Sequence, residues 1–141
     1  TKANYKALPR ATYTSPALAS VGLTEKVARE KYGDNVKIIS WPYKENDRAR
    51  ATSDVTGLVK VIVTKKGYIL GACIVGTSAD ELLAVWTMAI SQGLNIKSIA
   101  NLISPYPTLG EINKRAASSF YTETLFSDKT KKIVKLLSYL G

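Results

Sequence analysis

Residues 58–75 read LVKVIVTKKGYILGACIV, two β-branched apolar runs separated by Lys65, Lys66 and Gly67. Such runs favour strands, and a short linker whose glycine can take a positive φ favours a hairpin between them. Valine alternates with other residues at positions 59, 61 and 63, which predicts that the first strand buries one face. Residues 68–75 are apolar on both faces, so the second strand is expected in the middle of a sheet.

Shorter patterns before this hairpin predict further strands and a helix. Residues 11–14, 19–22 and 36–43 favour strands, the first two separated by Ser15-Pro16 because proline ends ladder pairing. Thr24 is expected to cap a helix that Gly33 ends, with Glu25 and Arg29 forming an i,i+4 pair. Residues 45–54 are charged and compatible with a helix.

After the hairpin, apolar residues recur at the spacing of a helix. Ser78 and Glu81 have capping-box spacing, and the apolar residues that follow predict one helix up to Gly93 with Trp86 in the core. A shorter helix is expected over 96–102. The whole pattern predicts an α+β fold with a mostly antiparallel sheet covered by helices.

Composition narrows the classes of function. The chain has 141 residues and 45% apolar content, which suits one domain with its own core. It has no histidine and a single Cys73, so a histidine-based triad, an internal disulfide and a cysteine-rich metal site are excluded, and no metal site is expected. Cys73 is expected to be a small buried hydrophobe.

Charge leaves two interpretations open. Twenty Lys and Arg against eleven Asp and Glu give a net charge of +9, which suits either a solvated basic surface or a phosphate-rich partner. The sequence has no signal peptide and no apolar stretch of the roughly 18 residues that a membrane span needs. We therefore expect a cytoplasmic protein, with contact at the inner face of a membrane as a second expectation.

A proline-stiffened stretch precedes the last strong helical pattern. Residues 104–116 read SPYPTLGEINKRA, in which Pro107 restricts Tyr106 and places its ring on a stiff segment. Thr108 and Glu111 have capping-box spacing. In such a box the Thr108 side chain accepts from the Glu111 amide, and the Glu111 carboxylate accepts from the Thr108 amide.

This stretch resembles the His-x-His-Pro-Thr-x-x-Glu signature of the flavin-dependent pyridine nucleotide-disulfide oxidoreductases. Pro107, Thr108 and Glu111 match, whereas Ser104 and Tyr106 stand at the two histidine positions. Residues 9–25 resemble the start of the same family's C-terminal domain. The resemblance covers roughly residues 9–117, and the Tyr-Pro-Thr variant is similar to a mercuric-reductase-like branch.

The resemblance implies a C-terminal dimerisation domain that supplies a homodimer interface and part of the partner subunit's active site. It makes Glu111 and Tyr106 the catalytic candidates, and it places Pro107 and Thr108 near the cofactor only through the partner subunit. The full-length protein would use FAD and NAD(P). This chain has no Gly-x-Gly-x-x-Gly loop, so we expect it to bind neither by itself.

The residues allow simpler roles as well. A tyrosine has an ordinary pKa of about 10 against about 6.5 for histidine, so a neutral hydrogen-bonding role for Tyr106 is more natural than a basic one. Glu111 can be a capping residue alone, and Tyr106 can be an interface aromatic. The alternative function, from another class, is a stand-alone basic module that binds nucleic acid or an anionic membrane; under the oxidoreductase interpretation we expect no nucleic acid partner.

Three segments are expected in the chain. Residues 1–8 are expected to link to missing upstream domains, and residues 9–126 to form the dimerisation domain. Residues 127–141 read SDKTKKIVKLLSYLG and predict a basic amphipathic helix. This helix is expected either to pack on the domain or on a dimer partner, or to make peripheral contact with an anionic membrane.

Overall fold

A five-stranded antiparallel sheet organises residues 5–122, the part of the chain that this computed structural model describes. The strand order is β1-β2-β5-β4-β3. The strands are β1 (Arg10–Thr12), β2 (Leu18–Gly22), β3 (Val36–Pro42), β4 (Leu58–Thr64) and β5 (Ile69–Val75). The predicted hairpin is β4 and β5, and Gly67 in its turn has a φ of +85°. β5 is the central strand, as its two apolar faces predicted.

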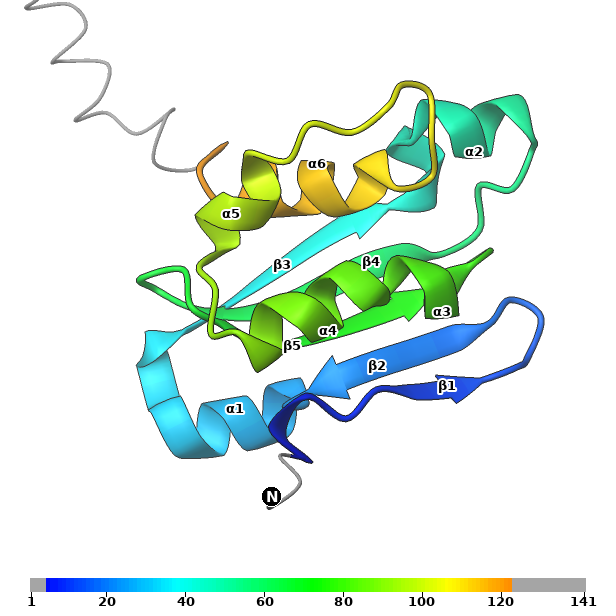
Figure 1. The fold of residues 1–141 in the computed structure, drawn as a ribbon. Helices are drawn as coiled ribbons and strands as arrows, with labels where there is room; N and C mark the ends of the chain where they lie inside the picture. The colour runs from blue at the N-terminus through cyan, green and yellow to red at the C-terminus, as the bar shows by residue number, and fades with distance from the viewer. Residues whose placement is uncertain (1–4, 123–141) are drawn as a thin grey trace, which may run out of the picture.

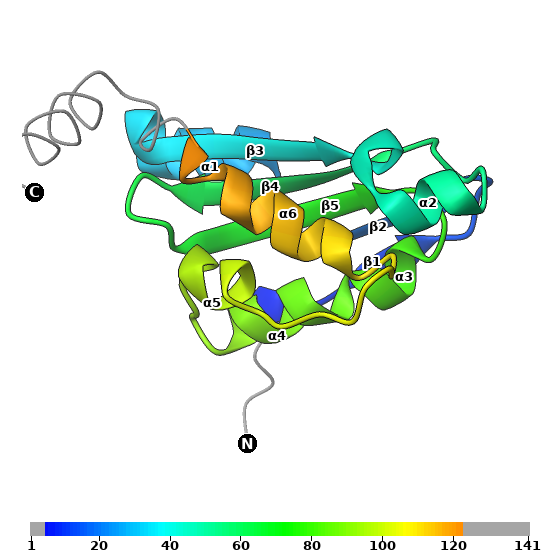
Figure 2. The same cartoon turned by 90° about the horizontal axis from the view of Figure 1, so that it is seen from above.

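Helices cover both faces of the sheet, which confirms the α+β prediction (Figures 1 and 2). The helices are α1 (Glu25–Tyr32), α2 (Asp47–Ala51), α3 (Ala79–Leu82), α4 (Ala84–Ser91), α5 (Ile96–Ala100) and α6 (Glu111–Ser119). Single 3₁₀ turns are η1 (Tyr5–Ala7), η2 (Gly33–Asn35) and η3 (Tyr43–Glu45). The larger core cluster joins the sheet to α4, α5 and α6, and a smaller cluster joins the other face to α1.

The core follows the alternation of the strands. Val59, Val61 and Val63 are fully buried on the side of α4 and α6, as predicted. Ile62 points to the other face, where it packs with Ala28 of α1. Trp86 is also fully buried, which confirms its predicted place in the core.

The start of α1 forms as the sequence predicted. The Thr24 side chain accepts a hydrogen bond from the Val27 amide at 3.3 Å and caps the helix. Arg29 Nε donates to Glu25 Oε1 at 2.9 Å, and Lys60 Nζ of β4 lies 2.5 Å from the other carboxylate oxygen. These pairs lower the pKa of Glu25, the hydrogen bond from Lys60 having the largest effect.

Two predictions about residues 78–93 are wrong. The helix predicted up to Gly93 is two helices, because α3 ends at Leu82 and α4 begins at Ala84. Ser78 does not form a capping box, since its backbone is left-handed with a φ of +57° and its side chain makes no capping bond.

Cys73 is half-buried rather than buried. It lines a hollow together with Lys60 and Glu25 on the sheet face that carries α1, where helical cover is smaller. Burial raises the pKa of the Cys73 thiol, and the Lys60 charge opposes that rise.

Membrane-spanning character and the chain ends were also addressed by the sequence predictions. None of the helices within residues 5–122 has the length and apolar character needed to cross a membrane. The helix predicted for residues 127–141 lies outside the described residues, as do residues 1–4 of the predicted 1–8 linker.

Candidate functional site

The loop of residues 101–110, between α5 and α6, holds Tyr106, Pro107 and Thr108, and the fourth predicted site residue, Glu111, follows it directly. The loop arches over the N-terminal end of α6 and comes down beside α2 (Figure 1). Tyr106 is 66% exposed and Ile103 is 96% exposed, so the loop presents large apolar groups to solvent.

A buried asparagine fixes this loop to α2. Asn46 is 3% exposed, and its Nδ2 donates to the Thr108 carbonyl at 3.1 Å. Its Oδ1 accepts from the Ala49 amide at 2.9 Å, which makes Asn46 the N-cap of α2. One side chain therefore starts α2 and holds the loop 62 residues further along the chain.

The predicted capping box of Thr108 and Glu111 is wrong. The hydroxyl of Thr108 donates to the Pro105 carbonyl at 2.8 Å, so Thr108 stabilises the loop itself. Gly110 occupies the N-cap of α6 with helical backbone angles and no side-chain bond. Glu111 is therefore the first residue of α6 and makes no capping bond to Thr108.

Tyr106 makes a hydrogen bond that the sequence did not reveal. Its hydroxyl donates to Asp47 Oδ2 at 2.9 Å. Asp47 is the first residue of α2, directly after the Asn46 cap, so the contact that fixes the loop also places this carboxylate. The sequence showed residues 45–54 as charged and helix-compatible, which marks Asp47 as helical but not as a neighbour of Tyr106.

Charges around Tyr106 keep its phenol protonated. The hydrogen bond to Asp47 raises the pKa of Tyr106 most, and the charges of Asp47 and Glu111 raise it further, while Arg115 acts in the opposite direction. Glu111 thus acts on Tyr106 through its charge, although within residues 5–122 the two side chains share no hydrogen bond. At neutral pH Tyr106 is a hydrogen-bond donor and not a base.

A second buried asparagine holds the helix that begins with Glu111. Asn113 is 3% exposed, and its Oδ1 accepts from Trp86 Nε1 at 2.7 Å. Its Nδ2 donates to the Leu82 carbonyl at 2.9 Å. Because these partners lie on α3 and α4, α6 is fixed against both helices, and the position of Glu111 is fixed with it.

Metal-ligating side chains and glycine packing can be assessed over the residues that the structure describes. Within residues 5–122, no group of three His, Cys, Asp or Glu side chains is placed to hold a metal ion. A Cβ on Gly71 would lie 2.1 Å from the Leu23 carbonyl oxygen, and one on Gly76 would lie 2.4 Å from the Tyr43 ring. These glycines allow close packing inside the domain, so they do not fit a phosphate-binding loop.

The family model for the dimerisation domain of pyridine nucleotide-disulphide oxidoreductases matches residues 8–117. The chain belongs to this family. The match confirms the resemblance seen in the proline-rich motif and in residues 9–25, and it covers nearly the same part of the chain.

Curated relatives and solved structures agree with this assignment. Dihydrolipoyl dehydrogenase of Staphylococcus aureus is 38% identical over 115 residues, which are 81% of this chain and 24% of the relative. The mitochondrial dihydrolipoyl dehydrogenase of Schizosaccharomyces pombe is 38% identical over 114 residues, or 80% of this chain and 22% of the relative. The chain therefore spans about a quarter of the length of these relatives.

The same domain occurs in a solved flavoprotein disulfide reductase. The Cu(II) complex of the HOCl-induced flavoprotein disulfide reductase RclA from Escherichia coli is similar with a TM-score of 0.76 and 29% identity, over 81% of this chain and 26% of that one. LpdA from Mycobacterium tuberculosis has a TM-score of 0.77 at 22% identity, over 84% and 26%, and shows the shared fold. The chain is thus a dimerisation domain of the oxidoreductase type.

Proposed function

We propose that this domain works in an FAD- and NAD(P)-dependent enzyme, where it supplies the homodimer interface and part of the partner subunit's active site. The relatives are about four times as long as this chain, so the cofactor domains would lie in the rest of such a protein. Gly71 and Gly76 serve close packing inside the domain, which supports cofactor binding outside it.

The exposed apolar side chains of residues 101–110 are the main observation that supports this proposal. Leu102, Ile103 and Tyr106 are 37%, 96% and 66% exposed, although each could contribute to a core. Hydrogen bonds from Asn46 and to Asp47 fix this loop against α2. Its exposed apolar side chains therefore belong to an ordered surface. Exposed apolar groups of this kind favour an interaction surface, and the family's use of the domain indicates a second copy as the partner.

The motif residues have distinct proposed roles. Tyr106 would enter the partner's active site as a neutral phenol whose oxygen can accept a hydrogen bond, because its single proton is donated to Asp47 and its pKa is raised. Glu111 would add a carboxylate to the same site. Pro107 and Thr108 would contact the partner's cofactor side through the loop that they stiffen.

Substitution of Ile103 tests the interface. Ile103→Asp should weaken self-association at least tenfold in sedimentation velocity, because a carboxylate would have to be buried where an isoleucine packed. Val27→Asp is the matched control, since Val27 is 43% exposed on α1, on the other face of the sheet. Equal association constants for both variants would contradict the proposed interface.

A chimera tests the contribution to the active site. This chain would replace the matching C-terminal segment of the Staphylococcus aureus dihydrolipoyl dehydrogenase, and dihydrolipoamide oxidation would be measured. Tyr106→His should raise the rate at least tenfold, since a well-placed general base contributes about 10²-fold or more. Tyr13→His, at an 81% exposed position before β2, should leave the rate unchanged. Equal rates of dihydrolipoamide oxidation with tyrosine and with histidine at position 106 would show that the loop does not reach the partner's reacting groups.

The basic-module alternative gains no support from the comparisons. The family match and the relatives are all of the oxidoreductase class. The dimerisation domain therefore remains the function that the structure supports best.

A further inference from the structure

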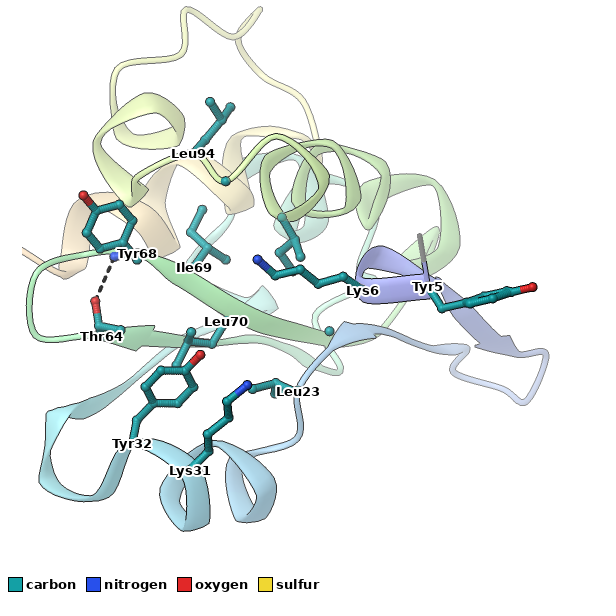
Figure 3. Close-up of a pocket in the computed structure, with 13 residues that line it drawn as sticks. Tyr5, Lys6, Leu23, Lys31, Tyr32, Thr64, Tyr68, Ile69, Leu70 and Leu94 are labelled. Atoms are coloured by element: carbon teal, nitrogen blue, oxygen red, sulfur yellow. Dashed lines mark hydrogen bonds between the residues drawn. The ribbon is translucent and has the colours of Figure 1, made fainter. Parts of the chain in front are cut away.

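A hollow of about 550 Å³ lies at the opposite end of the sheet from Tyr106 and its partner Asp47; Figure 3 shows the residues around it. It opens where β4 ends and β5 begins, between α1 and the end of α4. In the pairing of β3 with β4, Pro42 and Leu58 lie at the end near Asp47 and Tyr106, whereas Val36 and Thr64 lie at the opposite end. Seven paired residues separate the two places by about 20 Å.

The walls of the hollow are mainly apolar. Leu23, Ile69, Leu70, Ile90 and Leu94 supply its aliphatic surface. Tyr32 and Tyr68 add aromatic rings, and Figure 3 shows the Tyr32 ring beside Leu70. The volume lies within the roughly 300–1,000 Å³ of small-molecule sites, which are usually apolar with a few polar groups.

Two lysines supply the charge of this hollow. Lys6 comes from η1 and Lys31 from α1, and Figure 3 shows both side chains extending toward the space between these elements. The residues that line the hollow, all of them described, include no aspartate or glutamate. Lys31 Nζ lies 5.5 Å from the centroid of the Tyr32 ring, so it stays near the aromatic wall. An anion entering here would meet positive charge from two elements.

A buried hydroxyl adds a directional group. Thr64 is 6% exposed, and its Oγ1 accepts from the Tyr68 amide at 3.0 Å. A threonine hydroxyl that accepts one bond keeps its proton to donate. The wall thus offers an uncharged donor near the end of β4, between the two tyrosines.

We propose that this hollow binds a small organic anion, a carboxylate or phosphate carried on a flat apolar body. Lys6 and Lys31 would hold the charged group, and the aliphatic wall with Tyr32 and Tyr68 would cover the apolar body. Such a site is additional to the proposed dimer interface and does not involve residues 101–116.

Isothermal titration of the chain with 2-naphthoate and with 2-naphthyl phosphate tests the proposal. Both probes should bind saturably at one site per chain, and the tighter of the two identifies the preferred anion. 2-Naphthalenemethanol has the same rings without the charge and should bind at least tenfold more weakly. Raising the salt concentration should weaken the binding of the two anions and leave the binding of the alcohol unchanged.

Lysine variants locate the site. Lys31→Gln should weaken 2-naphthoate binding about fivefold, and Lys6→Gln with Lys31→Gln about 25-fold, because each partly exposed charge contributes up to about a factor of five. Lys44→Gln in η3, an exposed lysine at the opposite end of β4, is the matched control and should have no effect. Circular dichroism checks that each variant is folded. Absence of saturable binding, equal binding of the alcohol, or equal effects of Lys31→Gln and Lys44→Gln would overturn the proposal.

Discussion

Removal of the Asn113 side chain should destabilise the domain more than any exposed substitution on the same helix. The side chain makes a buried hydrogen bond with Trp86 Nε1 at 2.7 Å and a partly buried one to the Leu82 carbonyl at 2.9 Å. Asn113→Ala removes both and leaves the indole N–H and the carbonyl without these partners. Each bond contributes about 1 kcal/mol net, and a buried group left unsatisfied costs about 1–3 kcal/mol, so we expect a loss of about 3 kcal/mol.

Urea unfolding followed by tryptophan fluorescence measures this loss. With a slope of about 1.5 kcal/mol per molar urea, the midpoint should fall by about 2 M. All variants are compared at one protein concentration, because self-association would add to the apparent stability. Lys114→Ala, the next residue of α6, is the control and should stay within about 0.5 kcal/mol of the parent chain.

A double-mutant cycle separates the hydrogen bond from simple loss of packing. Trp86→Phe removes the indole donor, so the combined Trp86→Phe and Asn113→Ala change should cost at least about 1 kcal/mol less than the sum of the single changes. Additive effects, or an Asn113→Ala variant as stable as Lys114→Ala, would refute the claim that Asn113 fixes α6 against α3 and α4.

Three further predictions concern titration and backbone. Burial raises the pKa of the Tyr43 phenol to about 12, so the folded state keeps a proton that the unfolded chain loses near pH 10. This contribution to stability is complete below pH 10 and is lost between about pH 10 and 12; in urea titrations Tyr43→Phe should lose less stability over that range than the parent chain. Gly76→Ala would place a Cβ 2.4 Å from the Tyr43 ring at a φ of +149° and should lower the thermal midpoint far more than Gly33→Ala, where the same Cβ meets open space. Asp47→Asn should shift the Tyr106 titration, measured by ultraviolet difference absorbance against a Tyr106→Phe reference, to lower pH, because the hydrogen-bonded carboxylate is the main cause of the raised pKa. An unchanged Tyr106 titration would show that this contact is not formed in solution.

Local patterns predicted the elements whose own residues decide their structure. The hairpin of β4 and β5 combines β-branched runs with a glycine that takes a positive φ, and both signals lie within 18 residues. Trp86 was predicted in the core because apolar neighbours at helical spacing gave its helix one buried face. The Thr24 cap formed because its partner lies three residues away.

Predictions failed where distant residues compete for the same polar groups. Thr108 has the spacing of a capping residue, but its hydroxyl donates to the Pro105 carbonyl instead. Its own carbonyl accepts a hydrogen bond from the Asn46 side chain. Asp47 reaches Tyr106 across 59 residues of sequence, a contact that periodicity cannot indicate. The roles proposed for Tyr106, Glu111, Pro107 and Thr108 in a partner's active site also depend on a second chain, so they stay predictions.

A longer-range packing contact explains a third omission. Ile112 and Ala116 have the spacing of one apolar face of α6, but an asparagine at position 113 is expected to face solvent unless its partners are known. Its partners on α3 and α4 precede it by about 30 residues. Buried polar residues are therefore the features of this fold that single-sequence patterns identify least well.

Sedimentation equilibrium of the 141-residue chain tests most directly whether it is a dimerisation domain. Over a series of protein concentrations, with reductant present to keep Cys73 from cross-linking, the data should fit a reversible monomer–dimer equilibrium and approach twice the chain mass. Ile103→Asp should move that equilibrium toward monomer. A chain that stays strictly monomeric at the highest concentrations, with the Ile103→Asp variant indistinguishable from it, would contradict the proposed function.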